Sequence, residues 1–145
     1  MRISETVHRE ICRELQTVPP EKGGILGAVD GVIRLWYLDA GTAETERFVY
    51  VPNIAVLNRV LECWGDQGIR FAGMFHSHPP GQQELSGADR TYIQRIMEAM
   101  PPSVTELHFP LVLPGTGMIG YRAERRDGRV ILHPETIIIE KEQSI

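Results

Sequence analysis

The stretch GMFHSHPPGQQELSGAD, from Gly73 to Asp89, joins a strand-like apolar run to two histidines that are one residue apart. Two prolines follow the second histidine, and a polar loop then leads to Ser86 and Asp89 at helix-capping spacing. Such a segment is either a merely polar turn, or a place where four side chains converge on one metal ion. The rest of the sequence is needed to choose between these interpretations.

The two histidines are predicted to project from the same side of a strand. Residues i and i+2 of a strand point to one face, about 6.5–7 Å apart, so His76 and His78 project together while Ser77 faces away. Two imidazoles at that spacing can tilt toward one ion and bind it at about 2.0–2.1 Å. Pro79 and Pro80 cannot donate to a strand ladder, so the chain leaves the sheet where an open coordination site needs room.

Asp89 lies eleven residues beyond His78, in the first turn of a helix that is predicted to start near Ser86. A loop of that length allows its carboxylate to return to the same ion. Two histidines and one carboxylate leave a fourth position for water, as in catalytic zinc sites, and bound zinc lowers the pKa of such a water to about 7. Ser86 and Asp89 also have the spacing of a capping box, which requires no function, but a cap does not explain two histidines that end an apolar strand.

The surrounding sequence predicts helices on both sides of this segment. Apolar residues recur at helical spacing over residues 4–18, 53–68 and 86–100, and apolar runs bounded by turn residues predict strands over 23–29, 31–40, 69–78, 107–113, 117–125 and 129–140. Asp-Gly pairs at 30–31 and 127–128 are typical of tight turns between antiparallel strands. The order of elements predicts an α+β, or mixed α/β, domain with a central mixed β-sheet flanked by about three helices.

Length and composition indicate one soluble domain over residues 1–145. Hydrophobic residues make up 42% and charged residues 23%, which argues against disorder. The formal net charge of −4 argues against a general nucleic-acid binder. Cys12 and Cys63 lack paired spacing and are predicted to be reduced, partly buried thiols. The first residues resemble no signal peptide and no run approaches the roughly 18 apolar residues of a membrane span, so we expect a cytoplasmic protein without a membrane partner.

The motif around the two histidines resembles that of a known family. The letters HSHP, six further residues and SGAD match the signature H-[ST]-H-P-x6-S-x-x-D of the JAB/MPN domain, which is found in JAMM metalloproteases and deubiquitinases. Upstream, PPEKGGILG places Glu21 where family members carry a glutamate before a glycine-containing strand. The predicted order of elements agrees over nearly the whole chain. The resemblance implies a JAB/MPN-like, cytidine-deaminase-like single domain.

The resemblance also implies a role for each matching side chain. His76, His78 and Asp89 correspond to the ligands of one Zn²⁺ per chain, Glu21 to the glutamate that hydrogen-bonds the zinc-bound water and carries its proton, and Ser86 to the serine that helps to hold the oxyanion. Peptide hydrolysis needs a nucleophile, a base that later acts as an acid, and a donor directed at developing negative charge, so this set is chemically complete.

Other titratable residues are weaker candidates for the site. Glu84 lies within the loop itself and is the main rival to Glu21 as the base, although Glu21 immediately precedes two glycines that allow close approach of the backbone. His8, His108 and His133 show no ligand spacing and are expected to be surface or packed histidines.

Three rival functions share parts of this pattern. A cupin-type metal site also uses His-x-His followed by glutamate, but cupins are nearly all strand, and three amphipathic helices are predicted here. A non-catalytic MPN-type interaction scaffold is expected to lack metal ligands, whereas the full set is present. A metal-dependent hydrolase of a small-molecule conjugate would use the same residues, so the sequence leaves that alternative open.

The family resemblance also suggests a substrate. The chain looks like the small stand-alone prokaryotic members, which implies hydrolysis of a peptide or isopeptide bond at the C-terminal Gly-Gly-type tail of a ubiquitin-like or sulfur-carrier protein. Such a tail is expected to lie along an edge strand, with residues 41–51 or 80–85 lining its channel. The sequence does not identify the natural substrate, the cleavage site or the need for a partner. It also leaves open the oligomeric state, which includes a homo-oligomer. The predicted ligands favour zinc but do not prove it over another divalent ion.

Overall fold

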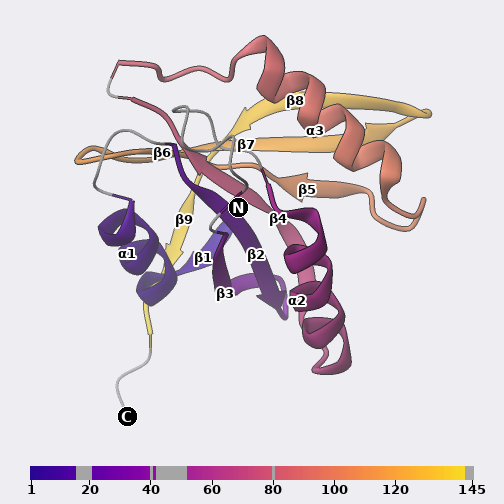
Figure 1. The fold of residues 1–145 in the computed structure, drawn as a ribbon, viewed down its shortest axis with the longest axis horizontal. Helices are drawn as coiled ribbons and strands as arrows, with labels where there is room; N and C mark the ends of the chain where they lie inside the picture. The colour runs from indigo at the N-terminus through magenta and orange to yellow at the C-terminus, as the bar shows by residue number, and fades with distance from the viewer. Residues whose placement is uncertain (16–20, 40, 42–51, 80, 143–145) are drawn as a thin grey trace.

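The computed structural model of the protein describes residues 1–15, 21–39, 41, 52–79 and 81–142. Along these ranges the elements are β1 (Arg2–Ser4), α1 (Glu5–Glu14), β2 (Gly23–Val29), β3 (Val32–Asp39), α2 (Ile54–Asp66), β4 (Arg70–Ser77), α3 (Gly87–Ala99), β5 (Glu106–His108), β6 (Leu111–Leu113), β7 (Gly117–Arg126), β8 (Arg129–Glu135) and β9 (Ile138–Glu140) (Figure 1). The predicted fold class, a mixed sheet with three helices, is confirmed for this described part of the chain.

One mixed sheet contains all of these strands, and β4 lies near its middle. β4 pairs antiparallel with β2 on one side and parallel with both β5 and β6 on the other. β5 and β6 both pair antiparallel with β7 as well, so they occupy one position in the sheet, end to end. The spatial order is therefore β8, β7, β5 with β6, β4, β2, β3, β1 and β9.

The sheet is curled so that its two edges approach each other. β8 and β9 lie at opposite edges, although only residues 136 and 137 separate them in the chain. Three Cα steps span at most about 11 Å, whereas seven strand spacings would cover about 34 Å in a flat sheet. Figure 1 shows the consequence: β5, β7 and β8 run across the direction of β2 and β4.

Strand alternation divides the interior into two cores. Ile25 and Met74 belong to the core under α2 and α3, whereas their neighbours Leu26 and Phe75 belong to the core under α1. Each helix adds its apolar face to one of these cores: Leu57 and Trp64 from α2, Ile93 and Met97 from α3, and Val7 and Ile11 from α1. His76 follows Met74 by two residues, so the histidines project on the side of α2 and α3.

Two strands predicted as continuous are divided in the structure. The predicted strand 107–113 is interrupted at Phe109 and Pro110, because proline has no N–H for the ladder. The predicted strand 129–140 forms β8 and β9, which lie at opposite edges of the sheet. β1 was not predicted, since three residues are too few for an alternation signal.

The predicted helix 4–18 is observed as α1, with Ser4 as its N-cap. The described helix ends at Glu14 and Leu15 is its C-cap, whereas residues 16–18 lie outside the described part. Both thiols are free, as predicted; Cys12 is partly buried as expected, whereas Cys63 is exposed, so the expectation that it is partly buried was wrong. In the described ranges, no helix has the length and apolar character needed to cross a membrane.

Candidate metal centre

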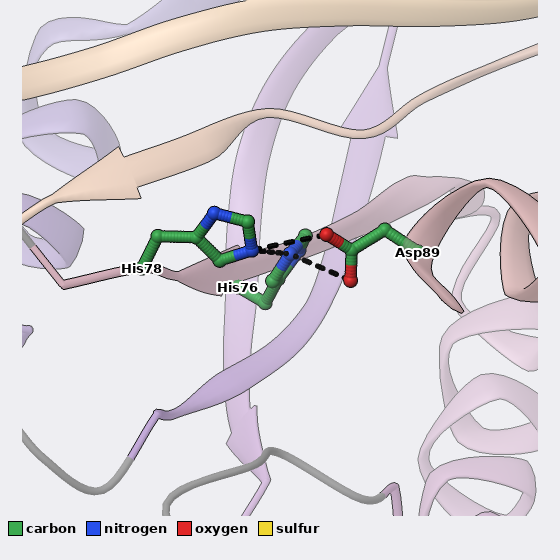
Figure 2. Close-up of side chains that lie close together, drawn as sticks. All are labelled: His76, His78 and Asp89. Atoms are coloured by element: carbon green, nitrogen blue, oxygen red, sulfur yellow. Dashed lines mark hydrogen bonds and ion pairs between the residues drawn. The ribbon is translucent and has the colours of Figure 1, made fainter. Parts of the chain in front are cut away.

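Three side chains converge where β4 ends and α3 begins, as Figure 2 shows. The Nε2 atoms of His76 and His78 lie 3.0 Å apart. Asp89 faces both rings: its Oδ1 lies 3.3 Å from Nε2 of His76, and its Oδ2 lies 3.0 Å from Nε2 of His78. The two histidines come from the end of one strand and the carboxylate from the first turn of a helix, so this cluster depends on the packing of α3 against the sheet.

The spacing of the donor atoms fits a single divalent cation. Two ligands of a tetrahedral zinc ion at about 2.0–2.1 Å are separated by roughly 3.3 Å, close to the distances between the three side chains. If both imidazole Nε2 atoms carried hydrogens, two N–H groups would face each other across 3.0 Å. Two imidazoles and one carboxylate are a ligand set that suits zinc. The three residues present therefore fit the zinc ion that the sequence pattern predicts.

A backbone carbonyl orients His78. Its Nδ1 lies 3.2 Å from the carbonyl oxygen of Gln82, and because a carbonyl only accepts, Nδ1 is the donor. In the neutral ring, Nε2 then carries the lone pair that a metal needs. The side chain is only 4% exposed, which restricts its motion further. The loop after the two prolines thus selects the tautomer of His78, a candidate metal ligand.

Asp89 belongs to the helix cap and to the cluster at once. The Ser86 N–H donates to Oδ2 of Asp89 at 2.8 Å, and the Asp89 N–H donates to Oγ of Ser86 at 3.1 Å, which together form a capping box. The two interpretations of the Ser-x-x-Asp spacing are therefore compatible. Because the Ser86 oxygen accepts within the cap, its hydroxyl proton can be donated to a group outside it.

The charges in the cluster shift the pKa values of two groups. Burial alone would raise the pKa of Asp89, but hydrogen bonds from His76 and His78 hold it far below its usual range. Burial lowers the pKa of His78, but the hydrogen bond and charge of Asp89, with the charge of Glu21, outweigh it and raise that pKa. A proton and a metal ion therefore compete for Nε2 of His78.

Glu21 is held beside the histidines through its neighbour Lys22. The Lys22 N–H donates to Oγ of Ser77 at 2.9 Å, and the Ser77 N–H donates to the Lys22 carbonyl at 2.8 Å. These two bonds fix the segment that precedes β2 against the residue between His76 and His78. Strand alternation predicts only that Ser77 faces away from the histidines, so this positioning role was not predicted. The middle serine of His-Ser-His was the available signal.

Two hollows flank the cluster. A cavity of about 250 Å³ is bordered by Glu21, His76 and Asp89. A second, open hollow of about 510 Å³ is lined by His78, Ser86 and the loop residues 81–84. The structure therefore places Glu21 and Ser86, the two predicted catalytic residues, at two different hollows beside the cluster. Their catalytic roles stay predictions.

The remaining predicted candidates lie apart from the cluster or at its rim. Glu84 is exposed in the open hollow and does not border the cavity that Glu21 lines. His108 Nδ1 lies 2.8 Å from Glu135, and His133 Nε2 lies 3.6 Å from Glu124. His8 lies 4.0 Å from the Cys12 thiol on α1. The structure thus brings together His76, His78 and Asp89, and none of these three other histidines joins them.

Comparison with solved structures shows the fold. A JAB1/MPN domain protein from Archaeoglobus fulgidus matches with a TM-score of 0.57 at 17% identity, covering 97% of this chain and 100% of that one. A protein from Desulfitobacterium hafniense matches with a TM-score of 0.66 at 18% identity, covering 97% and 93%. A protein from Salinibacter ruber matches with a TM-score of 0.55 at 18% identity, covering 97% and 92%. The chain therefore has an MPN-like fold.

The sequence itself gives no closer assignment. No family model matches the chain. No curated protein sequence matches it either. The fold and the geometry of the cluster are thus the observations from which a function has to be argued.

Proposed function

We propose that this protein is a zinc-dependent metallopeptidase or isopeptidase of the JAMM type that acts in the cytoplasm. Its substrate is a peptide or isopeptide bond at the C-terminal tail of a ubiquitin-like or sulfur-carrier protein. One observation carries the proposal: His76, His78 and Asp89 converge beside Glu21 within an MPN-like fold.

His76, His78 and Asp89 would hold one zinc ion, and no other group of potential ligands has been found in the described ranges. Zinc at such a site polarises a carbonyl and lowers the pKa of water to about 7. The protein supplies the rest. The Gln82 carbonyl keeps His78 in the ligating tautomer, and the capping box aims the Asp89 carboxylate.

Glu21 transfers protons during hydrolysis, and Ser86 stabilises the developing negative charge. Glu21 accepts a proton from the attacking water, and the water oxygen bonds to the carbonyl carbon. The Ser86 hydroxyl donates to the oxygen on which negative charge develops, which is typically worth about 10²–10³ in rate. Glu21 then gives its proton to the leaving nitrogen as the C–N bond breaks, so the products are a carboxylate and an amine.

The open hollow supports the choice of substrate. Residues 81–84 border it together with His78 and Ser86, so an extended tail that lies there reaches the cluster. Glycines in the tail would let its backbone approach the loop closely. Of the two segments predicted to line the channel, residues 42–51 and Pro80 lie outside the described part of the chain.

Elemental analysis of the purified protein tests the metal assignment. We expect about one zinc per chain in the parent, loss of zinc in His78→Ala, and retention of zinc without hydrolysis in Glu21→Gln. Glu84→Gln is the matched control, because it removes the rival carboxylate and is expected to keep both zinc and activity.

Two other results would redirect the proposal. If the parent binds no zinc even after reconstitution, the non-catalytic MPN scaffold replaces it. If Glu84→Gln abolishes hydrolysis while Glu21→Gln does not, the general base has been assigned wrongly. A zinc-loaded protein that cleaves only small-molecule conjugates would keep the site and change the substrate.

A further inference from the structure

The cavity beside the metal centre has two different walls. Glu21, His76 and Asp89 form the polar wall, which faces the candidate metal position. The rest of the lining is apolar and comes from β4, from α3, from the connection between β5 and β6 and from the residue two before α2: Pro52, Met74, Phe75, Ala88, Tyr92, Ile93 and Phe109. A cavity of this kind, mostly apolar with a few polar groups at one end, is typical of a binding site for an apolar group.

The apolar wall is preformed by the core and by the helix that carries Asp89. Ile93 is 2% exposed and Phe109 is 2% exposed, so both are held by packing. The Tyr92 hydroxyl lies 3.1 Å from the Met74 sulfur, which directs its polar end away from bulk solvent. Burial and the charge of Asp39 raise the pKa of Tyr92, so this side chain stays neutral. The wall therefore presents no charge to a ligand.

The position of Glu21 indicates which side of the scissile bond lies next to this cavity. In the proposed reaction, Glu21 gives its proton to the leaving nitrogen, so the amine side of the scissile bond must lie next to Glu21. Ser86, which serves the carbonyl oxygen, borders the other hollow. The acyl side of the substrate thus lies toward residues 81–84, and the amine side lies toward the apolar cavity.

We infer that the 250 Å³ cavity binds an apolar side chain on the amine side of the scissile bond. This inference rests on the proposed function and narrows its substrate class. The preferred substrate is a tail in which a large apolar residue, such as leucine or phenylalanine, follows the bond that is cut, and not a lysine side chain of a conjugated protein.

The size of the cavity agrees with such a residue. A buried apolar cavity of about 150 Å³ is large enough to bind benzene, so 250 Å³ holds a leucine or phenylalanine side chain. A glycine in the same place would leave the cavity unfilled. A lysine would bring its ammonium group against Met74, Ile93 and Phe109, and burying that charge beside apolar side chains is costly.

A peptide series measures this preference. The zinc-loaded protein is given peptides that end in Gly-Gly-X, where X is glycine, alanine, leucine, phenylalanine or lysine, and kcat/KM is measured for release of X. We expect leucine and phenylalanine to exceed glycine by about 10- to 100-fold, as filling an apolar pocket typically allows. An isopeptide with the Gly-Gly carboxyl group on a lysine side chain is expected to be poorer than either.

Two variants test whether the preference for leucine and phenylalanine comes from this cavity. Ala88→Leu adds apolar volume to this cavity from α3, and is expected to lower kcat/KM for the leucine peptide toward the value for the glycine peptide. Gln94→Leu is the matched control, because it adds the same side chain at an exposed position of the same helix that does not border the cavity. It is expected to behave as the parent.

A binding measurement gives a readout that does not depend on catalysis. Leucinamide and glycinamide are titrated into the parent and into Ala88→Leu, with and without zinc, and methyl NMR signals of Met74 and Ile93 are followed. We expect shifts with leucinamide in the parent alone. This readout also covers the case in which Ala88→Leu folds poorly, since the parent is compared with two ligands.

The outcomes separate this inference from the proposed function. Hydrolysis that is equal for glycine and leucine peptides, or that favours the lysine isopeptide, overturns the inference and leaves the proposed function standing. No hydrolysis of any peptide by the zinc-loaded protein overturns the proposed function and the orientation with it. Leucinamide that shifts neither methyl signal overturns the apolar site itself.

Discussion

Ser77 shows how one residue organises the centre without facing it. Its side chain is buried, and it points to the side of β4 away from the two histidines. There its hydroxyl oxygen accepts the N–H of Lys22, and its own N–H reaches the Lys22 carbonyl. Glu21 is the preceding residue, so its position relative to His76 and His78 depends on these two backbone bonds.

At the residue scale, we expect Ser77→Ala to lower kcat more than it lowers zinc content. The change removes the hydroxyl oxygen that accepts the half-buried Lys22 N–H, which should cost about 1 kcal/mol of unfolding free energy. Ser77→Thr keeps the hydroxyl and is expected to restore activity. Denaturant unfolding, elemental analysis and peptide hydrolysis measure the three quantities. Ser103→Ala, in an exposed loop, is the control, and a Ser77→Ala enzyme with parental kcat would refute the positioning role.

At the scale of elements, a β-bulge shapes β4 ahead of the histidines. Leu26 pairs with Gly73 and Gly27 pairs with Phe71, so Ala72 is the extra residue of β4. Gly73 has a φ of 142°, and a Cβ at this position would lie 1.7 Å from the carbonyl oxygen of His108. β4 and β5 therefore come so close here that only glycine fits. The strand then continues from Gly73 to the two histidines.

We expect Gly73→Ala to destabilise the protein by about 3 kcal/mol or more, because strained backbone and overpacking add together. Gly65→Ala is the matched control. Gly65 lies in α2 with open space around its Cα, so alanine there should stabilise the helix by about 0.5–1 kcal/mol. Urea unfolding of both variants provides the comparison, and a Gly73→Ala protein as stable as the parent would contradict the role given to this contact.

At the scale of the whole molecule, curling of the sheet brings its edges together near Glu135. This residue ends β8 and its carboxylate, only 5% exposed, lies 2.8 Å from Nδ1 of His108 in β5 and beside the amino group of Met1. Burial raises the pKa of Glu135, but the hydrogen bond from His108 and the charge of the Met1 amino group outweigh it, so the net shift is downward. The Glu135 carboxylate thus links β8 to β5 and to the N-terminus, which precedes β1 in another part of the curled sheet.

A lowered pKa fixes the sign of the pH dependence. The folded protein binds the Glu135 proton less tightly than the unfolded chain does, so this stabilisation is present above the ordinary pKa of 4.5 and is lost as the pH falls through the lower folded value. We expect Glu135→Gln to lower the unfolding free energy by about 1–3 kcal/mol at pH 7. The difference from the parent should shrink below pH 4.5.

Denaturant unfolding between pH 3 and pH 8 tests this expectation. Glu62→Gln on the exposed face of α2 is the control and should follow the parent across the range. A Glu135→Gln difference that stays constant with pH would show that the carboxylate charge does not contribute to stability.

Local sequence patterns were enough to predict the three helices, most of the strands and the candidate ligands of the centre. Helical periodicity and Asp-Gly turns are local signals, so α1, α2, α3 and the β2–β3 hairpin were predicted within a few residues. The spacing of His76 and His78 is also local, because two residues along a strand always share a face. Asp89 came from the motif and from its capping position, and the structure brings it to both histidines.

Features that depend on contacts between distant residues could not be predicted from local patterns and became visible in the folded chain. The division of residues 129–140 into two strands at opposite edges follows from the curl of the whole sheet, which no local pattern encodes. The Ser77–Lys22 bonds join residues 55 positions apart. The apolar cavity exists because α3 packs over β4 in one particular register. Local sequence sets which backbone conformations are favourable, but the shape of a site is set by the packing of elements that meet only in the folded chain.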